Sequence, residues 1–119
     1  MPKNLKLKKN NIELVCLAGF MKILSKNFIK KFKGKILNIH PSLLPKYKGL
    51  NTHQRVLNNK EKYSGCTVHF VNARLDSGKI ILQKKVKISK KDNGSSLAKK
   101  ILVQEHKLYP KAILKVFNL

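Results

Sequence analysis

Short apolar runs separated by polar segments predict the strands of the first half of the chain. Residues 14–17 form an apolar run that leads towards Gly19, which is typical of a buried parallel strand ending in a tight turn. Residues 36–39 form a second run of the same kind. Between the two runs, Ser25 is the predicted cap of a helix that Gly34 terminates.

The next part of the pattern predicts a loop, a short helix and two more strands. Residues 41–51 contain two prolines and a glycine, so we expect a shaped loop, followed by a short helix over residues 53–58. Residues 66–71 and 79–88 are the predicted strands. The turn-rich connection between them holds Asp76, a residue type that favours turns.

The last segment has the spacing of an amphipathic helix over residues 95–117, with a kink or break expected at Pro110. The order of the segments predicts an α/β fold, namely an open sheet of mostly parallel strands with flanking helices. Chemistry in such sheets collects beyond the carboxyl ends of the strands, where residues 19–21 and 38–40 lie. The apolar positions of the predicted helix are Leu97, Ile101, Leu102, Leu108, Ile113 and Phe117.

Length and composition fit one globular domain. The chain has 119 residues, of which 42% are hydrophobic. Residues 1–11 are predicted to be a basic lead-in, and residues 12–119 the domain. The longest apolar stretch is too short to span a bilayer and no secretory signal follows the basic start, so we expect a cytoplasmic protein that does not enter a membrane. Cys16 and Cys66 are expected to be buried free thiols.

The charge raises the question of nucleic-acid binding. The formal net charge is +22, but only two of the 27 basic residues are arginine. Sites that read bases rely on arginine forks, and the lysines here are spread along the whole chain. We therefore expect weak, salt-sensitive contact with polyanions and no specific nucleic-acid partner.

Asn38, His40 and Asp76 are the candidate chemical residues. In an extended segment, residues two apart point to the same side, so Asn38 and His40 would face one space. An amide can donate to a developing oxyanion, an imidazole can move a proton, and a carboxylate can orient the imidazole. Metal binding by His40, His53, His69 and Asp76 is the chemical alternative, but their spacing matches no standard zinc signature.

A longer motif surrounds these residues. Residues 38–47 read Asn-Ile-His-Pro-Ser-Leu-Leu-Pro-Lys-Tyr. This run resembles the signature of the phosphoribosylglycinamide formyltransferase family, and residues 17–25, 65–83 and 104–110 match further segments of that family. The resemblance covers nearly all of residues 12–117 and implies a partial formyltransferase-type sheet that lacks the family's amino-terminal half.

The resemblance implies a reaction without a metal. In this family the amine of glycinamide ribonucleotide attacks the formyl carbon of 10-formyltetrahydrofolate, a step of purine biosynthesis. Asn38 would hold the oxyanion, His40 would donate a proton or stabilise charge, Asp76 would orient His40, and His69 would support the cluster. The implied folate-binding residues are Met21, Lys22, Ile23, Leu24, Val71, Asn72, Ala73, Arg74 and Leu75. The implied substrate-binding residues are Gly19, Met21, Pro41 and Glu105.

Three departures from the family pattern bear on these expectations. Lys22 replaces the usual arginine, which removes a fork for the folate tail. Ser77 and Lys79 stand where glycine and proline are usual. The family's Gly/Ser-rich phosphate-binding loop has no counterpart in the chain. We expect one of three origins for that half: it is supplied by a separate chain, it has been lost, or it lies outside the given sequence. Alone, the chain is expected to be marginally stable and weakly active.

Three alternative functions remain. Methionyl-tRNA formyltransferases share the Asn-x-His pattern and suit the basic charge, but the chain has no counterpart of their tRNA-binding domain. Formyltetrahydrofolate hydrolases share Asn38, His40 and Asp76, but residues 40–42 and 46–47 resemble the purine enzyme more closely. A non-catalytic remnant or polyanion-binding module with the same fold is the alternative outside the enzymes.

Overall fold

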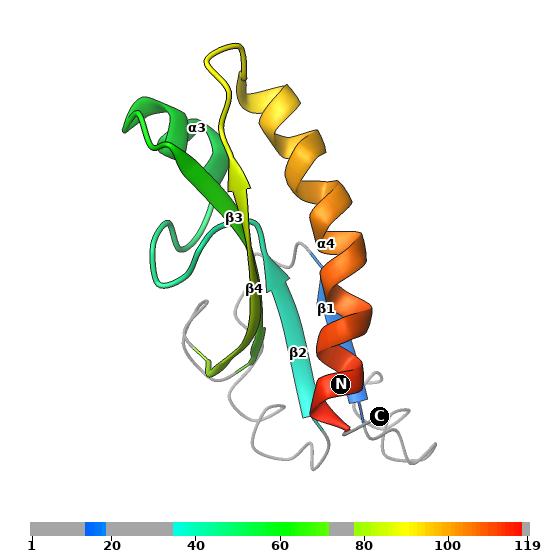
Figure 1. Ribbon diagram of the computed structural model, residues 1–119. Helices are drawn as coiled ribbons and strands as arrows, with labels where there is room; N and C mark the ends of the chain where they lie inside the picture. The colour runs from blue at the N-terminus through cyan, green and yellow to red at the C-terminus, as the bar shows by residue number, and fades with distance from the viewer. Residues whose placement is uncertain (1–13, 19–34, 72–77, 118–119) are drawn as a thin grey trace.

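The computed structural model describes residues 14–18, 35–71 and 78–117 (Figure 1). These residues contain both strands and helices, which confirms the predicted α/β class. The predicted lead-in over residues 1–11 and the predicted helix that begins at Ser25 lie outside the described residues. The described elements, in chain order, are β1 (Leu14–Ala18), β2 (Lys35–His40), α3 (Thr52–Asn58), β3 (Tyr63–Phe70), β4 (Ile80–Lys87) and α4 (Gly94–Val116).

The described strands form one sheet in the order β1-β2-β3-β4. β1 and β2 are parallel, whereas β2–β3 and β3–β4 are antiparallel. The prediction of mostly parallel strands is therefore wrong for the described part of the chain. The apolar run of β2 reflects burial of the whole strand, which is common in parallel sheets but also occurs in a central strand of a mixed sheet.

The connection between β2 and β3 explains their antiparallel pairing. A parallel neighbour needs a crossover that returns along the sheet. α3 has seven residues, which span only about 10 Å. β2 has six residues, which span about 20 Å. α3 alone therefore does not carry the chain back along β2. β3 starts beyond the end where β2 finishes and runs the other way.

A single core lies between the sheet and α4, which runs along it (Figure 1). A capping box begins α4: Ser96 N–H donates to Asn93 Oδ1 at 2.8 Å, and Asn93 N–H donates to Ser96 Oγ at 2.9 Å. The core side chains, all buried, are Leu37, Ile39, Val56, Cys66, Val68, Ile81, Leu97, Ile101, Leu108 and Ala112.

Pro110 lies inside α4 without ending it. Proline removes one backbone donor and crowds the preceding turn. Leu108 and Ala112, on either side of Pro110, are buried against the sheet, so packing holds this turn helical. The predicted break is therefore absent.

The other element predictions agree with the structure within a few residues. The predicted strand over residues 66–71 begins earlier, at Tyr63, because the polar residue Ser64 is also buried in the sheet. The prediction of two buried thiols is confirmed for Cys66 and wrong for Cys16, which is exposed on β1. No helix among the described residues is both long and apolar enough to cross a membrane.

Candidate active site

Alternate residues of β2 face opposite sides of the sheet. Leu37 and Ile39 belong to the core beneath α4. Asn38 and His40 therefore point to the other face, as the sequence predicts. Both are buried, with 4% and 1% of their surfaces exposed. The packing of β2 against α4 thus fixes the direction of the two polar side chains.

β3 adds two more buried polar residues to this face. In the β2–β3 register, His69 lies opposite Asn38 and Thr67 lies opposite His40. His69 and Thr67 are 2% and 0% exposed. We call Asn38, His40, Thr67 and His69 the polar face of the sheet. Four buried polar residues cost free energy unless they are hydrogen-bonded or serve a function.

His69 fixes the orientation of the Asn38 amide. His69 Nδ1 lies 2.9 Å from the carbonyl oxygen of Phe70, which can only accept, so Nδ1 carries a proton. In the neutral ring, Nε2 is then an acceptor, and it receives a hydrogen bond from Asn38 Nδ2 at 3.3 Å. No described residue donates to Asn38 Oδ1, although this atom is buried. An acceptor left in this state costs about 1–3 kcal/mol and is a sign of a functional position.

A backbone carbonyl fixes the protonation of His40 on one side of its ring. His40 Nε2 lies 2.7 Å from the carbonyl oxygen of Tyr47. Since a carbonyl cannot donate, Nε2 carries a proton in both charge states of the ring. Nδ1 is therefore the nitrogen whose proton can be exchanged.

His53 lies close enough to this cluster to sense its charge. Burial, and then the positive charge of His40, lowers the pKa of His53. Its Nδ1 atom is buried and has no partner among the described residues. The sequence pattern gives His53 only as a candidate metal ligand and does not place it in the catalytic set. Its place at the start of α3, directly after the loop that follows His40, was the available signal.

Only some of the predicted binding residues lie among the described residues. Val71 directly follows β3, and its N–H donates to the carbonyl of Ile36 at 2.8 Å. Pro41 is half-buried next to His40. The predicted site residues that lie outside the described residues are Gly19, Met21, Lys22, Ile23, Leu24, Asn72, Ala73, Arg74, Leu75 and Asp76.

Gly78, just before β4, lies very close to the backbone at the end of β3. A Cβ atom at Gly78 would lie 1.6 Å from the carbonyl oxygen of Phe70. Any other residue would force β3 and the start of β4 apart. Ser77, one of the departures from the family pattern, lies outside the described residues, and Lys79 is exposed.

Glu105 is on α4, and the described contacts do not join it to Asn38 or His40. Burial raises the pKa of Glu105. Burial, and then the negative charge of Glu105, also raises the pKa of Cys66 to about 12. The Cys66 thiol is therefore protonated near neutral pH and is a packing group rather than a nucleophile.

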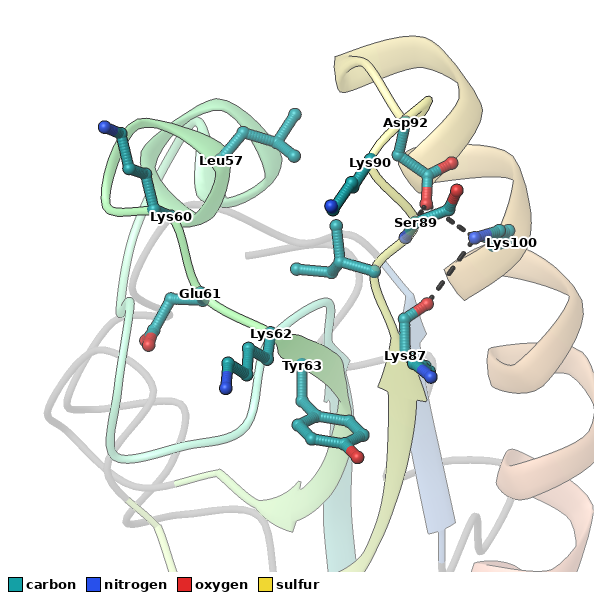
Figure 2. A pocket seen from close by; sticks show the side chains of 11 residues that line it. Leu57, Lys60, Glu61, Lys62, Tyr63, Lys87, Ser89, Lys90, Asp92 and Lys100 are labelled. Carbon is teal, nitrogen blue, oxygen red and sulfur yellow. Dashed lines mark hydrogen bonds and ion pairs between the residues drawn. The ribbon is translucent and has the colours of Figure 1, made fainter.

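A cavity lies elsewhere on the molecule, between α3, the start of β3 and the start of α4 (Figure 2). Its volume is about 1190 Å³. It begins at Tyr63, six positions before His69 on β3, or about 20 Å along the strand. The charged residues that line it are Lys60, Glu61, Lys62, Lys87, Lys90, Asp92 and Lys100.

Both carboxylates of this cavity are already paired. Glu61 Oε2 accepts from Tyr47 Oη at 3.0 Å, and Lys46 Nζ lies 3.5 Å away. Lys100 Nζ lies 2.5 Å from Asp92 Oδ2, and this contact leads those that lower the pKa of Asp92 to about 2. The lysines resemble those spread over the whole chain, so this cavity offers charge but no reactive group. The polar face is therefore the candidate site.

Among the described residues, no group of three His, Cys, Asp or Glu side chains is arranged to hold a metal ion. Asp76, one of the candidate ligands, lies outside these residues. The cluster instead combines an amide and imidazoles at hydrogen-bonding distance, which suits the handling of a developing oxyanion and a proton.

Comparison with known proteins agrees with this chemistry. A family model described as formyl transferase matches residues 3–113. The phosphoribosylglycinamide formyltransferase of Haemophilus influenzae is 50% identical over 102 residues, which cover 86% of this chain and 48% of that protein. The trifunctional purine biosynthetic protein adenosine-3 of Homo sapiens is 47% identical over 110 residues, which cover 92% of this chain and 11% of that protein.

Solved structures show the same likeness. The phosphoribosylglycinamide formyltransferase of Anaplasma phagocytophilum has a TM-score of 0.89 and 45% identity, over 94% of this chain and 54% of that one. The enzyme of Bacillus halodurans has a TM-score of 0.90 and 36% identity, over 97% of this chain and 59% of that one. The chain spans about half the length of the single-function curated relatives that it matches, at 48%. It belongs to the formyl transferase family.

Proposed function

We propose that this chain provides the catalytic centre for transfer of a formyl group from 10-formyltetrahydrofolate to the amine of glycinamide ribonucleotide, a cytoplasmic step of purine biosynthesis. The observation that carries the proposal is the buried contact of Asn38 with His69, with His40 two residues along the same strand. The family membership and the names of the relatives support this choice of reaction.

The first step uses Asn38. The amine nitrogen forms a bond to the formyl carbon, and the π electron pair of the carbonyl moves to its oxygen. Asn38 Nδ2 has two N–H groups, of which one bonds to His69; the other donates to the oxyanion. The unpaired Oδ1 atom accepts an N–H of the attacking amine, which satisfies the buried acceptor.

The second step uses His40. The tetrahedral carbon re-forms its carbonyl bond and releases the folate nitrogen, which gains a proton while the former amine loses one. His40 stabilises or supplies this proton through Nδ1, since Nε2 donates to the Tyr47 carbonyl. Asp76 orients the imidazole, as the family resemblance implies.

The remaining residue roles belong to the same proposal. The segments 21–24 and 71–75 bind the folate, and Gly19, Met21, Pro41 and Glu105 border the ribonucleotide. The curated single-function relatives are about twice as long as the matched region. The part of these relatives that lies outside the matched region would supply the grip on the substrate phosphate.

A comparison of the wild-type chain with His40→Ala tests the proposal. We expect wild-type chain to form formylated product and His40→Ala to form it about 10²–10⁴-fold more slowly. Equal rates in the two proteins would contradict the proposal. If neither forms product while both bind a polyanion such as heparin equally, the chain is a non-catalytic module of the same fold.

A further inference from the structure

A buried hydrogen-bond network lies beneath the loop that follows His40. Thr67 is at its centre and is 0% exposed. Its hydroxyl donates to the carbonyl of Ser42 at 2.7 Å and accepts from Leu44 N–H at 3.1 Å and from Gln83 Nε2 at 2.9 Å. A hydroxyl has one donor and two acceptor sites, so Thr67 uses all of them.

Two further side chains extend the network along the loop. Gln83, on β4, also donates to the carbonyl of Leu44 at 2.8 Å. Ser42, which is 0% exposed, donates from Oγ to the carbonyl of Lys46 at 2.6 Å, with the carbonyl of Tyr47 at 3.2 Å. Side-chain hydrogen bonds thus hold the backbone of this loop, both to the sheet and within the loop itself.

The network ends on the carbonyl that contacts the catalytic imidazole. Tyr47 has a φ angle of 58°, which is uncommon for a residue with a side chain and costs about 1 kcal/mol. Arg55 lies 5.3 Å from the centre of the Tyr47 ring, and Glu61 accepts from its hydroxyl. The surroundings hold Tyr47 in this conformation, in which its carbonyl lies 2.7 Å from His40 Nε2.

From this arrangement we propose that Thr67 is a positioning residue for His40. Thr67 holds the loop through Ser42 and Leu44, and the loop holds the Tyr47 carbonyl on His40 Nε2. This keeps the neutral imidazole in the Nε2–H form, so that Nδ1 is the nitrogen that exchanges a proton. Thr67 itself touches neither the proposed amine nor the formyl group.

The alternative tautomer shows why this control matters. If the Tyr47 carbonyl moved away, a neutral His40 could carry its proton on Nδ1 and leave Nε2 without a donor role. The neutral ring would then present a protonated Nδ1 atom, which cannot accept a proton from the reaction. Misplacement of a catalytic group by about 1 Å can cost up to 100-fold in rate, so a buried residue outside the reacting atoms can affect turnover strongly.

Two variants of Thr67 distinguish the role of its hydroxyl from the role of its side-chain shape. Thr67→Val keeps the branched shape but removes the hydroxyl, whereas Thr67→Ser keeps the hydroxyl. Ser64→Ala is the matched control, because Ser64 is also buried on β3, at 2% exposed, and its Oγ has no described partner. Ser42→Ala removes a second part of the network by a different change.

The readout is nitrogen NMR of ¹⁵N-histidine in the full chain at a pH where imidazoles are neutral, with the His40 signals assigned by their loss in His40→Ala. We expect a single Nε2–H form in wild type, Thr67→Ser and Ser64→Ala, and a mixture of the two tautomers in Thr67→Val and Ser42→Ala. A wild-type pattern in folded Thr67→Val would overturn the proposal. If Thr67→Val does not fold, a wild-type pattern in Ser42→Ala overturns it instead.

The consequence for turnover rests on the proposed function and is measured separately. We expect kcat to fall about 10- to 100-fold in Thr67→Val with a smaller change in KM, and Thr67→Ser to restore it. A shift of tautomer with unchanged kcat would overturn the positioning role in catalysis. If the tautomers respond as expected but wild type transfers no formyl group, the proposed function fails while the link from Thr67 to His40 stands.

Discussion

The two faces of the sheet are built for different purposes. Leu37 and Asn38 are neighbours on β2, both at most 4% exposed, yet Leu37 packs in the core and Asn38 lies on the polar face. The core face satisfies its side chains by contact with α4. The polar face leaves the Asn38 Oδ1 atom without a described partner. We therefore expect stability to depend mainly on one face of the sheet and the proposed reaction on the other, one residue apart.

The largest expected effect separates activity from stability. Asn38→Ala removes the proposed oxyanion donor and should lower kcat about 10²–10³-fold. It removes one unsatisfied buried acceptor, Asn38 Oδ1, but takes the donor away from another, His69 Nε2. Because these two effects oppose each other, the free energy of unfolding should change by no more than about 1 kcal/mol. Formyl-transfer rates and chemical denaturation of the same preparation test both parts. A loss of several kcal/mol would make Asn38 a structural residue.

Leu37→Ala should show the opposite behaviour. Leu37 is 0% exposed, and truncation of a buried leucine costs about 2–5 kcal/mol. Denaturation by urea should reveal this loss, while protein that remains folded should transfer formyl groups within about threefold of wild type. Stability equal to that of wild type would contradict the assignment of Leu37 to the core.

Asp92 provides a pH test at the start of α4, away from both faces. The pKa of Asp92 is lowered to about 2, mainly by the contact with Lys100 and then by the hydrogen bonds from Ser89 and Ser96. Because the pKa is lowered in the folded state, the ionised Asp92 carboxylate stabilises the fold. This contribution is present above the unfolded pKa, near 3.8, and is lost as the pH falls towards about 2.

Thermal unfolding across this pH range tests Asp92→Asn against wild type. The variant should melt at a lower temperature above about pH 4, and the two curves should converge in acid. Curves that stay parallel down to pH 2 would show that the Asp92 carboxylate does not contribute through its charge.

Glu105→Gln should have the smallest effect. Burial raises the pKa of Glu105, so the carboxylate opposes folding once the pH rises through that pKa. Solvent screens a partly exposed group, so the variant should be more stable at neutral pH by less than about 0.5 kcal/mol, and the gain should vanish in acid. Destabilisation at neutral pH would indicate that a described contact of Glu105 favours its charged form.

Much of the fold could be predicted because apolar runs and helical spacing are local signals. Residues 36–39 were predicted as a strand from their apolar run alone, and α4 from its spacing. The antiparallel pairing of β2 with β3 could not be predicted, because a buried strand has the same apolar pattern in parallel and antiparallel sheets. The direction of β3 depends on the path of the connection over residues 41–62, and no local pattern gives that path.

Part of the candidate site could likewise be predicted from the sequence, and part could not. Asn38 and His40 could be predicted to share a side because they are two positions apart on a strand. Thr67 and Gln83 could not be connected to them, because their hydrogen bonds join segments that are 16 to 39 residues apart. No local pattern marks a residue that acts through a carbonyl such as that of Tyr47.

The most direct test of the central claim follows the formyl group itself. 10-Formyltetrahydrofolate labelled with ¹³C in the formyl group would be mixed with glycinamide ribonucleotide and either wild-type chain or Asn38→Ala. The proposed function predicts that NMR detects labelled formyl amide product with wild type, forming at least about 100-fold faster than with Asn38→Ala. Absence of labelled product with folded wild-type chain, or equal rates with both proteins, would contradict it.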